Sequence, residues 1–213
     1  MPARQGGGVR RLAAIAALAW LAAALPPASP GAQEAPKRRS AAELMDVLMW
    51  NREPVGGPFA LTDQTGRRRT DADFRGRLML VYFGFTYCPD ICPTDLQEMS
   101  RAVNLLGAEG EAVQPIFITL DPERDTADHL ATYVDLFHPR LVGLTGSPEA
   151  IGAAADAYRV YHEKVSTGPD AYTVDHSGFV YLMDREGRYL GFFPPNTSAE
   201  RMLTIIRPHL AAK

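Results

Sequence analysis

Residues 78–106, LMLVYFGFTYCPDICPTDLQEMSRAVNLL, decide the fold of this chain of 213 residues. The opening residues of the stretch are nearly all apolar, β-branched or aromatic, which predicts a buried strand. From Thr94 onward apolar residues recur at helical spacing, so a helix follows. Between strand and helix lie Cys88 and Cys92, the only cysteines of the chain. The stretch therefore predicts a dithiol at the N-terminus of a helix, where the pKa of a cysteine falls from about 8.5 towards about 3.5–7.5.

The flanking sequence predicts further strands and helices in alternation. The expected elements are a helix over 41–50, a hairpin from 59–62 and 69–70, a strand over 113–120, a helix from 125 or 126 to 137, a strand over 141–144, a helix over 147–158, an extended segment over 160–165, a loop over 166–171, a lead-in to His176 over 172–175, strands over 179–183 and 189–193, and a helix over 198–210. This order builds an α/β fold with a mixed central sheet flanked by helices. Because sites in such sheets lie where strands turn into helices, Cys88, Cys92 and Asp121 are expected at one edge.

The N-terminus has the pattern of an export signal. Residues 1–32 contain three arginines and no acidic residue, and an apolar run over 12–25 is followed by prolines. This run is short for a membrane span, which needs about 20 residues. The sequence therefore predicts a signal peptide or an N-terminal membrane anchor over 1–32, a tether and short helix over 33–58, and a globular domain over 59–213. That domain is expected in the cell envelope, on the periplasmic side.

Composition sets limits on the class of protein. The chain is 46% hydrophobic and 22% charged, which is enough apolar material for a packed core. The formal net charge is −3, and the basic residues are scattered among acidic ones, so a nucleic-acid partner is not expected.

The spacing of the two cysteines allows two kinds of chemistry. Four residues apart, their Cα atoms lie near the separation that a disulfide requires, so the sulfurs can oxidise to each other or hold one metal ion as thiolates. The spacing differs from the Cys-x-x-Cys of thioredoxins. A structural disulfide across so short a loop would constrain little of the unfolded chain.

An imidazole would complete a soft-metal site. Two thiolates bind Cu(I), and a histidine adds affinity for Cu(II), whereas structural zinc usually has four ligands. His176 lies in TVDHSGF, between a loop and a core strand, which suits a ligand. The other histidines suit surface or helix-end positions: His129, His138, His162 and His209.

Three more residues are candidates for the surroundings of the ligands. Asp121 and Asp175 are candidate hydrogen-bond acceptors next to the site, although both also suit turns or caps. Tyr87 precedes the first cysteine and is expected to stiffen the loop beside the metal.

Several motifs together resemble the Sco/SenC copper chaperones. FGFTYCPDICPTDL, TLDPERDT, LVGLTG and YTVDHSGFVYLMD occur in this order, and the resemblance runs from about Phe59 to His209. It implies a thioredoxin-like fold with an added N-terminal β-hairpin and an inserted hairpin or loop before the ligand histidine. It also implies a site for one copper ion made by Cys88, Cys92 and His176.

The resemblance further implies a role in assembly. Members of this family help to build the dinuclear copper (CuA) centre of cytochrome c oxidase, as metallochaperones, as thiol reductants of the target cysteines, or both. The implied partners are the copper-site subunit of the oxidase, another copper chaperone as donor, and a thioredoxin-like reductant. Membrane association would come from residues 12–25.

Two alternatives stay open at the level of sequence. A thiol–disulfide oxidoreductase would use Cys88 or Cys92 against a target disulfide and would depend little on His176. An inert envelope protein with a disulfide-closed loop would lose only modest stability when Cys88 is replaced. A cysteine-protease dyad lacks an evident orienting residue. A non-enzymatic metallochaperone is therefore the preferred interpretation.

Overall fold

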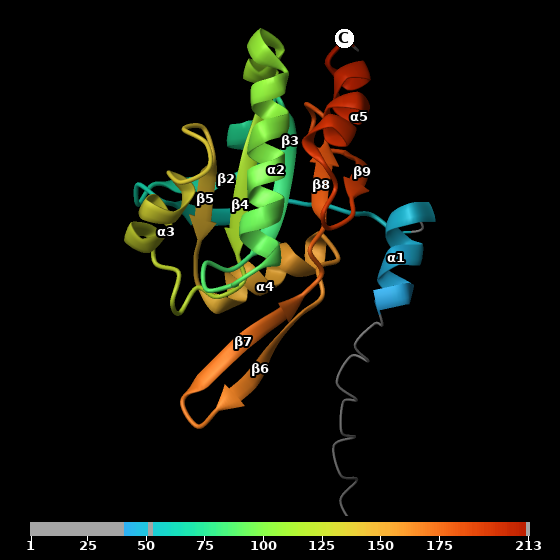
Figure 1. Cartoon of the computed structure of the whole chain (residues 1–213). Helices are drawn as coiled ribbons and strands as arrows, with labels where there is room; N and C mark the ends of the chain where they lie inside the picture. Colours follow the sequence, from blue (N-terminus) through green and yellow to red (C-terminus); the bar gives the residue numbers. More distant parts are fainter. Residues whose placement is uncertain (1–40, 51–52, 212–213) are drawn as a thin grey trace, which may run out of the picture. The chain divides into compact units, whose positions relative to one another are not determined.

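The computed structural model describes residues 41–50 and 53–211, which form a mixed sheet with helices on both faces (Figure 1). The sheet strands are β1 (Ala60–Asp63), β2 (Arg68–Thr70), β3 (Leu78–Gly84), β4 (Val113–Thr119), β5 (Val142–Thr145), β8 (Val180–Met183) and β9 (Tyr189–Phe193). The helices are α1 (Ala41–Trp50), α2 (Ile91–Leu105), α3 (Ala127–Val134), α4 (Pro148–Ala157) and α5 (Ala199–Ala211), with short 3-10 turns at Asp71–Phe74 and Gly107–Ala112. The predicted mixed α/β architecture is confirmed.

The seven strands lie in the order β2-β1-β5-β4-β3-β8-β9. β3 and β4 are parallel, with Leu78 opposite Val113 and Gly84 opposite Thr119, and β5 continues the parallel set. Every residue of β3 and β4 is buried, as expected for strands with helices on both faces, although β4 includes the polar residues Gln114 and Thr119. Both central strands end at the same edge, and the segments that follow them meet there.

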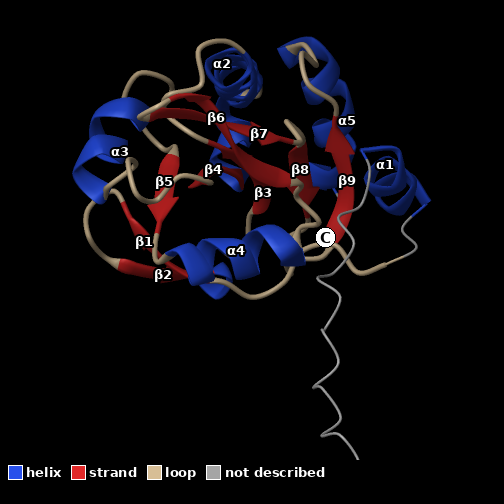
Figure 2. Cartoon of the chain, turned by 90° about the horizontal axis from the view of Figure 1, so that it is seen from below, coloured by secondary structure: helices blue, strands red, loops and turns tan. Residues whose placement is uncertain are grey.

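The helices divide between the two faces of the sheet (Figure 2). α2 and α5 pack against each other on one face, and α4 lies on the other. Arg101 of α2 pairs with Glu200 of α5, and Glu98 accepts a hydrogen bond from the backbone of Ala199 at 2.6 Å. These contacts fix the start of α5 against the helix that carries Cys92.

A second, two-stranded sheet consists of β6 (His162–Gly168) and β7 (Ala171–His176) and projects from the main sheet (Figure 1). The prediction of a loop over 166–171 was wrong in extent, because Ser166 pairs with Tyr172 and only Pro169 and Asp170 separate the strands. The strands of this hairpin are largely solvated, so their sequence lacks the apolar alternation that marks a half-buried strand.

Helix α2 begins at Ile91, three residues before the apolar spacing that predicted it becomes visible at Thr94, and Pro93 lies in its first turn. Cys92 therefore lies in the first turn of the helix and is followed by Pro93. This shift matters for the chemistry, because it brings backbone N–H groups of the first turn close to the sulfurs.

The N-terminal predictions fall mostly outside the described residues. The signal or anchor over 1–32 and the tether over 33–40 lie there, whereas the short helix is present as α1. Leu48 of α1 is buried, and its carbonyl accepts a hydrogen bond from the Tyr189 hydroxyl at 3.2 Å. Among the described helices, none combines the length and hydrophobicity needed to cross a membrane.

Candidate metal centre

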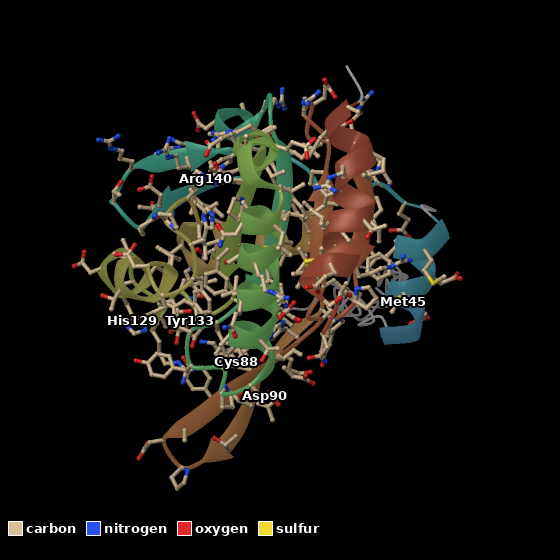
Figure 3. All side chains as sticks on the ribbon, turned by 45° about the horizontal axis from the view of Figure 1, so that its top comes forward. Met45, Cys88, Asp90, His129, Tyr133 and Arg140 are labelled. Atoms are coloured by element: carbon tan, nitrogen blue, oxygen red, sulfur yellow. The ribbon has the colours of Figure 1, made fainter. Side chains whose placement is uncertain are left out.

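Two sulfurs and one imidazole converge at the edge where β3 ends. Cys88 lies in the loop after β3, Cys92 in the first turn of α2, and His176 at the end of β7 (Cys88 is labelled in Figure 3). Their ligand atoms all lie within 4.8 Å of one another, and Cys92 Sγ is 3.2 Å from His176 Nε2. The structure thus brings together the three ligand candidates of the sequence, and the two cysteines do not form a disulfide.

The turn between β3 and α2 places the two sulfurs on one side. The backbone N–H of Cys88 donates to the carbonyl of Phe85 at 3.2 Å and closes the turn. The backbone N–H of Cys92 donates to Cys88 Sγ at 3.4 Å. A helix N-terminus thereby points at the first sulfur, which favours its thiolate form.

The two sulfurs differ strongly in acidity. A hydrogen bond from the Cys92 thiol, supported by His176, lowers the pKa of Cys88 far below its ordinary value, although partial burial acts in the opposite direction. Donation to Cys88 and burial raise the pKa of Cys92. Cys88 is therefore the more acidic of the two sulfurs, and Cys92, which is fully buried, the less acidic one.

Aromatic rings fix the plane of the ligand imidazole. The His176 ring meets Phe85 edge-on at 5.9 Å between centroids and Tyr82 at 6.3 Å. The next residue, Ser177, donates its backbone N–H to the carbonyl of Tyr161 at 3.0 Å. Nε2 consequently faces Cys92, and Nδ1 faces the protein interior, where it is buried.

Asp121 lies close to the centre but bonds to other groups. It is fully buried, accepts a hydrogen bond from the Tyr172 hydroxyl at 2.8 Å, and pairs with Arg124. The Arg124 guanidinium also lies 3.9 Å from the centroid of the Tyr172 ring, close enough for a cation–π interaction. Asp121 therefore connects the loop after β4 to the β6–β7 hairpin rather than to the imidazole.

The other two candidates lie at the outside of the site. Asp175 is exposed on β7, opposite Glu163 in the hairpin register. Tyr87 is 55% exposed, and its ring lies against His129 at 5.5 Å between centroids and against Arg124 at 4.7 Å. Tyr87 is thus an outer wall of the dithiol loop.

The remaining histidines are separate from the ligands. His129 bonds to Thr86 at 2.8 Å on the solvent side, and His138 is buried with Nδ1 accepting from the backbone of Arg140 at 3.0 Å. His162 lies opposite His176 in the hairpin register, and His209 is in the last turn of α5.

The sequence reasoning missed a buried carboxylate, Asp95 of α2. It is 1% exposed, and its Oδ1 accepts a hydrogen bond from the backbone N–H of Asn196 at 2.8 Å. Burial raises the pKa of Asp95 to about 6. The available signal was its position three residues after Cys92, which places both side chains on the same face of the helix.

Fold and site together define a thioredoxin-like thiol protein whose dithiol is completed by a histidine into a three-ligand centre. Comparison with known proteins then gives the family. The family model described as SCO1/SenC matches residues 49–211, and the chain belongs to this family.

Relatives occur in mitochondria and in bacteria. The mitochondrial SCO2 homologue of Mus musculus is 42% identical, over 98% of this chain and 82% of its own length. The human SCO2 homologue is 46% identical over 73% of this chain and 60% of its own length. The SCO2-like protein of Rickettsia prowazekii is 41% identical over 72% of this chain and 76% of its own length. This chain therefore spans less than two thirds of the human relative.

Solved structures agree with the fold. Bradyrhizobium japonicum ScoI with copper bound is 42% identical, with a TM-score of 0.69 over 73% of this chain and 99% of that one. Arabidopsis thaliana ScoI with copper bound is 40% identical, with a TM-score of 0.71 over 75% of this chain and 99% of that one. The expected thioredoxin-like fold is confirmed by these neighbours.

Proposed function

We propose that this chain is a copper metallochaperone that serves the assembly of the CuA centre of cytochrome c oxidase. Cys88, Cys92 and His176 hold one copper ion, as Cu(I) or Cu(II). The observation that carries the proposal is the convergence of two sulfurs and one imidazole nitrogen within 4.8 Å. Soft sulfur and imidazole donors favour copper, and the copper-bound ScoI relatives support the same cargo.

The unequal burial of the sulfurs suggests how copper enters and leaves. Cys88 is the more exposed and the more acidic of the two sulfurs, so an incoming ion meets it before Cys92. Binding to Cys92 then requires loss of its thiol proton, and His176 adds a third donor from the hairpin. Release proceeds in the opposite order, and a target thiolate that approaches from solvent reaches the metal on the Cys88 side.

The proposed setting is the outer face of a membrane. Residues 1–32 act as a signal peptide or an anchor through 12–25, residues 33–58 act as a tether with a short helix, and 59–213 form the copper-binding domain on the periplasmic side. The partners are the oxidase copper-site subunit, a donor copper chaperone and a thioredoxin-like reductant. The similarity to mitochondrial and rickettsial relatives supports this setting.

A thiol–disulfide oxidoreductase is the second candidate, and one observation favours it. Cys88 combines exposure with a lowered pKa and is hydrogen-bonded by a second, buried thiol. This is the arrangement of a nucleophilic cysteine with a resolving partner. Under this alternative, Cys88 attacks a disulfide of the oxidase subunit or another envelope protein, and His176 is dispensable.

Anaerobic copper titration separates the two candidates. Reduced wild-type protein is expected to bind one Cu(I) or one Cu(II), with a thiolate-to-copper absorption band for Cu(II). His176→Ala should lose the Cu(II) form, and His162→Ala, from the facing strand, serves as control. If wild type binds copper no better than Cys88→Ser, yet still reduces a test disulfide, the reductase function replaces the proposed one.

A further inference from the structure

Three polar atoms behind the metal centre are buried without a hydrogen-bond partner. They are the hydroxyl of Tyr82, Oδ2 of Asp95 and Nδ1 of His176. Tyr82 is 0% exposed and Asp95 is 1% exposed, so bulk water does not reach these two side chains. An unsatisfied buried polar group costs about 1–3 kcal/mol, and three such groups beside one site require an explanation.

The three atoms belong to one neighbourhood. A Cβ added at Gly178 would lie 3.6 Å from the Tyr82 hydroxyl and 3.7 Å from Asp95 Oδ2, so the absence of a side chain there leaves space beside both oxygens. His176 is two residues away along the chain and packs edge-on against the Tyr82 ring. Asp95 also interacts with the Tyr82 hydroxyl and, electrostatically, with His176.

The inner nitrogen of the ligand imidazole needs an acceptor. A histidine that binds metal through one ring nitrogen almost always donates the N–H of the other to a carboxylate, a carbonyl or a water. Nε2 of His176 faces the sulfurs, so Nδ1 is the nitrogen that must donate. Asp121 bonds to Tyr172 and Arg124, and Asp175 is exposed, so neither serves this purpose in the structure.

We propose that Tyr82, Asp95 and Gly178 form a buried water site that positions His176 for the metal. The water accepts the Nδ1–H of His176 and the O–H of Tyr82 and donates one proton to Asp95 Oδ2, which satisfies all three atoms. A buried water typically makes about three such bonds. Asp95 is then the positioning residue that keeps the His176 proton on Nδ1 and leaves the Nε2 lone pair directed at the metal.

The inference rests on the proposed function only in taking His176 as a ligand, and its first test needs no metal. The tautomer of His176 is read from ¹⁵N chemical shifts of histidine-labelled, reduced, metal-free protein at a pH where the imidazole is neutral. Wild type is expected to carry the proton on Nδ1. Asp95→Asn should shift it towards Nε2, whereas Asp175→Asn, which removes the same charge next to His176 but on the exposed side, should not.

Gly178→Ala tests the water itself. The added methyl would meet only ordinary contacts, 3.4 Å to Pro195 and longer to the two oxygens, but it would occupy the space beside them. The variant should therefore fold and show the same tautomer shift. Gly191→Ala on β9, where an added Cβ meets nothing within 4 Å, is the matched control.

Copper affinity provides the second readout. Loss of an outer hydrogen-bond partner of a metal ligand typically costs about 10–100-fold in affinity, which is the loss expected for Asp95→Asn and Gly178→Ala. A wild-type tautomer in both variants overturns the inference, whatever copper does. If wild-type protein does not bind copper, the proposed function is overturned. The tautomer test is unaffected, because it is made on metal-free protein. If Asp95→Asn does not fold, Gly178→Ala with its control decides the matter.

Discussion

Cys88 and Cys92 are four residues apart and yet differ in burial, hydrogen bonding and acidity. Cys88 accepts hydrogen bonds from the Cys92 thiol and, at 3.4 Å, from the Cys92 backbone N–H, and it is partly exposed. Cys92 is fully buried and faces His176 at 3.2 Å. An electrophile from solvent therefore meets the more acidic sulfur first. This asymmetry, more than the spacing of the cysteines, defines the chemistry of the centre.

Alkylation of the reduced, metal-free protein tests this asymmetry. An ordinary thiol has a pKa of about 8.5 and reacts slowly with iodoacetamide below that pH. Because the pKa of Cys88 is lowered, iodoacetamide should modify Cys88 selectively and should still do so well below this pH. Cys92→Ala removes the thiol that donates to Cys88, so the midpoint of the rate profile should move upward. Mass spectrometry identifies the modified residue. Faster modification of Cys92 would contradict the arrangement.

At the scale of the element, the β6–β7 hairpin carries His176, the third of the proposed ligands, and the contacts of the hairpin with the main domain determine where His176 lies. The Tyr172 hydroxyl bonds to the buried Asp121 at 2.8 Å, and the Tyr172 ring lies under Arg124. Lys164 of the same hairpin pairs with Glu123 at 2.8 Å. These contacts hold the hairpin against the loop after β4.

Tyr172→Phe keeps the ring and removes the hydrogen bond to Asp121. A bond to a charged group contributes about 1.5–3 kcal/mol, so local opening of the hairpin should increase by about tenfold or more. Hydrogen exchange of the β6 and β7 amides measures this opening. Tyr161→Phe is the control, because the Tyr161 hydroxyl donates to Glu163 of β6 at 2.8 Å. Equal exchange in both variants would show that the link to Asp121 does not hold the hairpin.

The β1–β2 hairpin depends on one carboxylate, Asp63. Although burial opposes its ionisation, hydrogen bonds from Thr65, Arg69 and Arg67 lower the pKa of Asp63 to about 2. In the unfolded chain the pKa of an aspartate is about 4. The lower pKa in the folded state stabilises the fold by about 2 kcal/mol above about pH 4, and this stabilisation is lost as the pH falls from about 4 to about 2. The turn therefore contributes to stability at neutral pH through a charge.

Asp63→Asn should lower the free energy of unfolding by about 2 kcal/mol at pH 7, measured by urea denaturation. The difference from wild type should shrink as the pH is lowered from about 4 to about 2. Asp156→Asn, an exposed carboxylate on α4, should stay within about 0.5 kcal/mol of wild type at each pH. A deficit for Asp63→Asn that is independent of pH would assign the effect to packing rather than to charge.

The sequence predicted the elements that are buried and missed features that depend on long-range contacts. β3 is a continuous apolar run, β4 is mostly apolar, and the dithiol follows β3, so the fold and the candidate ligands could be predicted from the chain. The extent of the β6–β7 hairpin could not be predicted, because its strands are solvated and carry no apolar alternation. Asp95 was missed for another reason. Its importance comes from Tyr82, Gly178 and His176, which are distant in sequence and become neighbours only after folding.

At the scale of the whole molecule, metal binding and oxidation compete for the same two sulfurs. Oxidation of the dithiol to an intramolecular disulfide removes both thiolates, so a preoxidised protein should not take up copper. A ligand that binds only the folded, reduced form raises the free energy of unfolding by RT ln(1 + [L]/Kd), about 2.7 kcal/mol at one hundred times Kd. Copper should therefore stabilise the reduced protein and leave the oxidised protein unchanged.

Thermal unfolding with and without Cu(I) measures this coupling in one experiment. For a domain of this size, a gain of about 2.7 kcal/mol corresponds to an increase in Tm of about 5–10 °C in the reduced protein. Cys88→Ser/Cys92→Ser is the control and should show no increase under either condition. An equal increase in the preoxidised protein would mean that copper binds away from the dithiol. Because the β6–β7 hairpin supplies only the imidazole, His176→Ala should keep part of the Cu(I) effect, whereas loss of both sulfurs should abolish it.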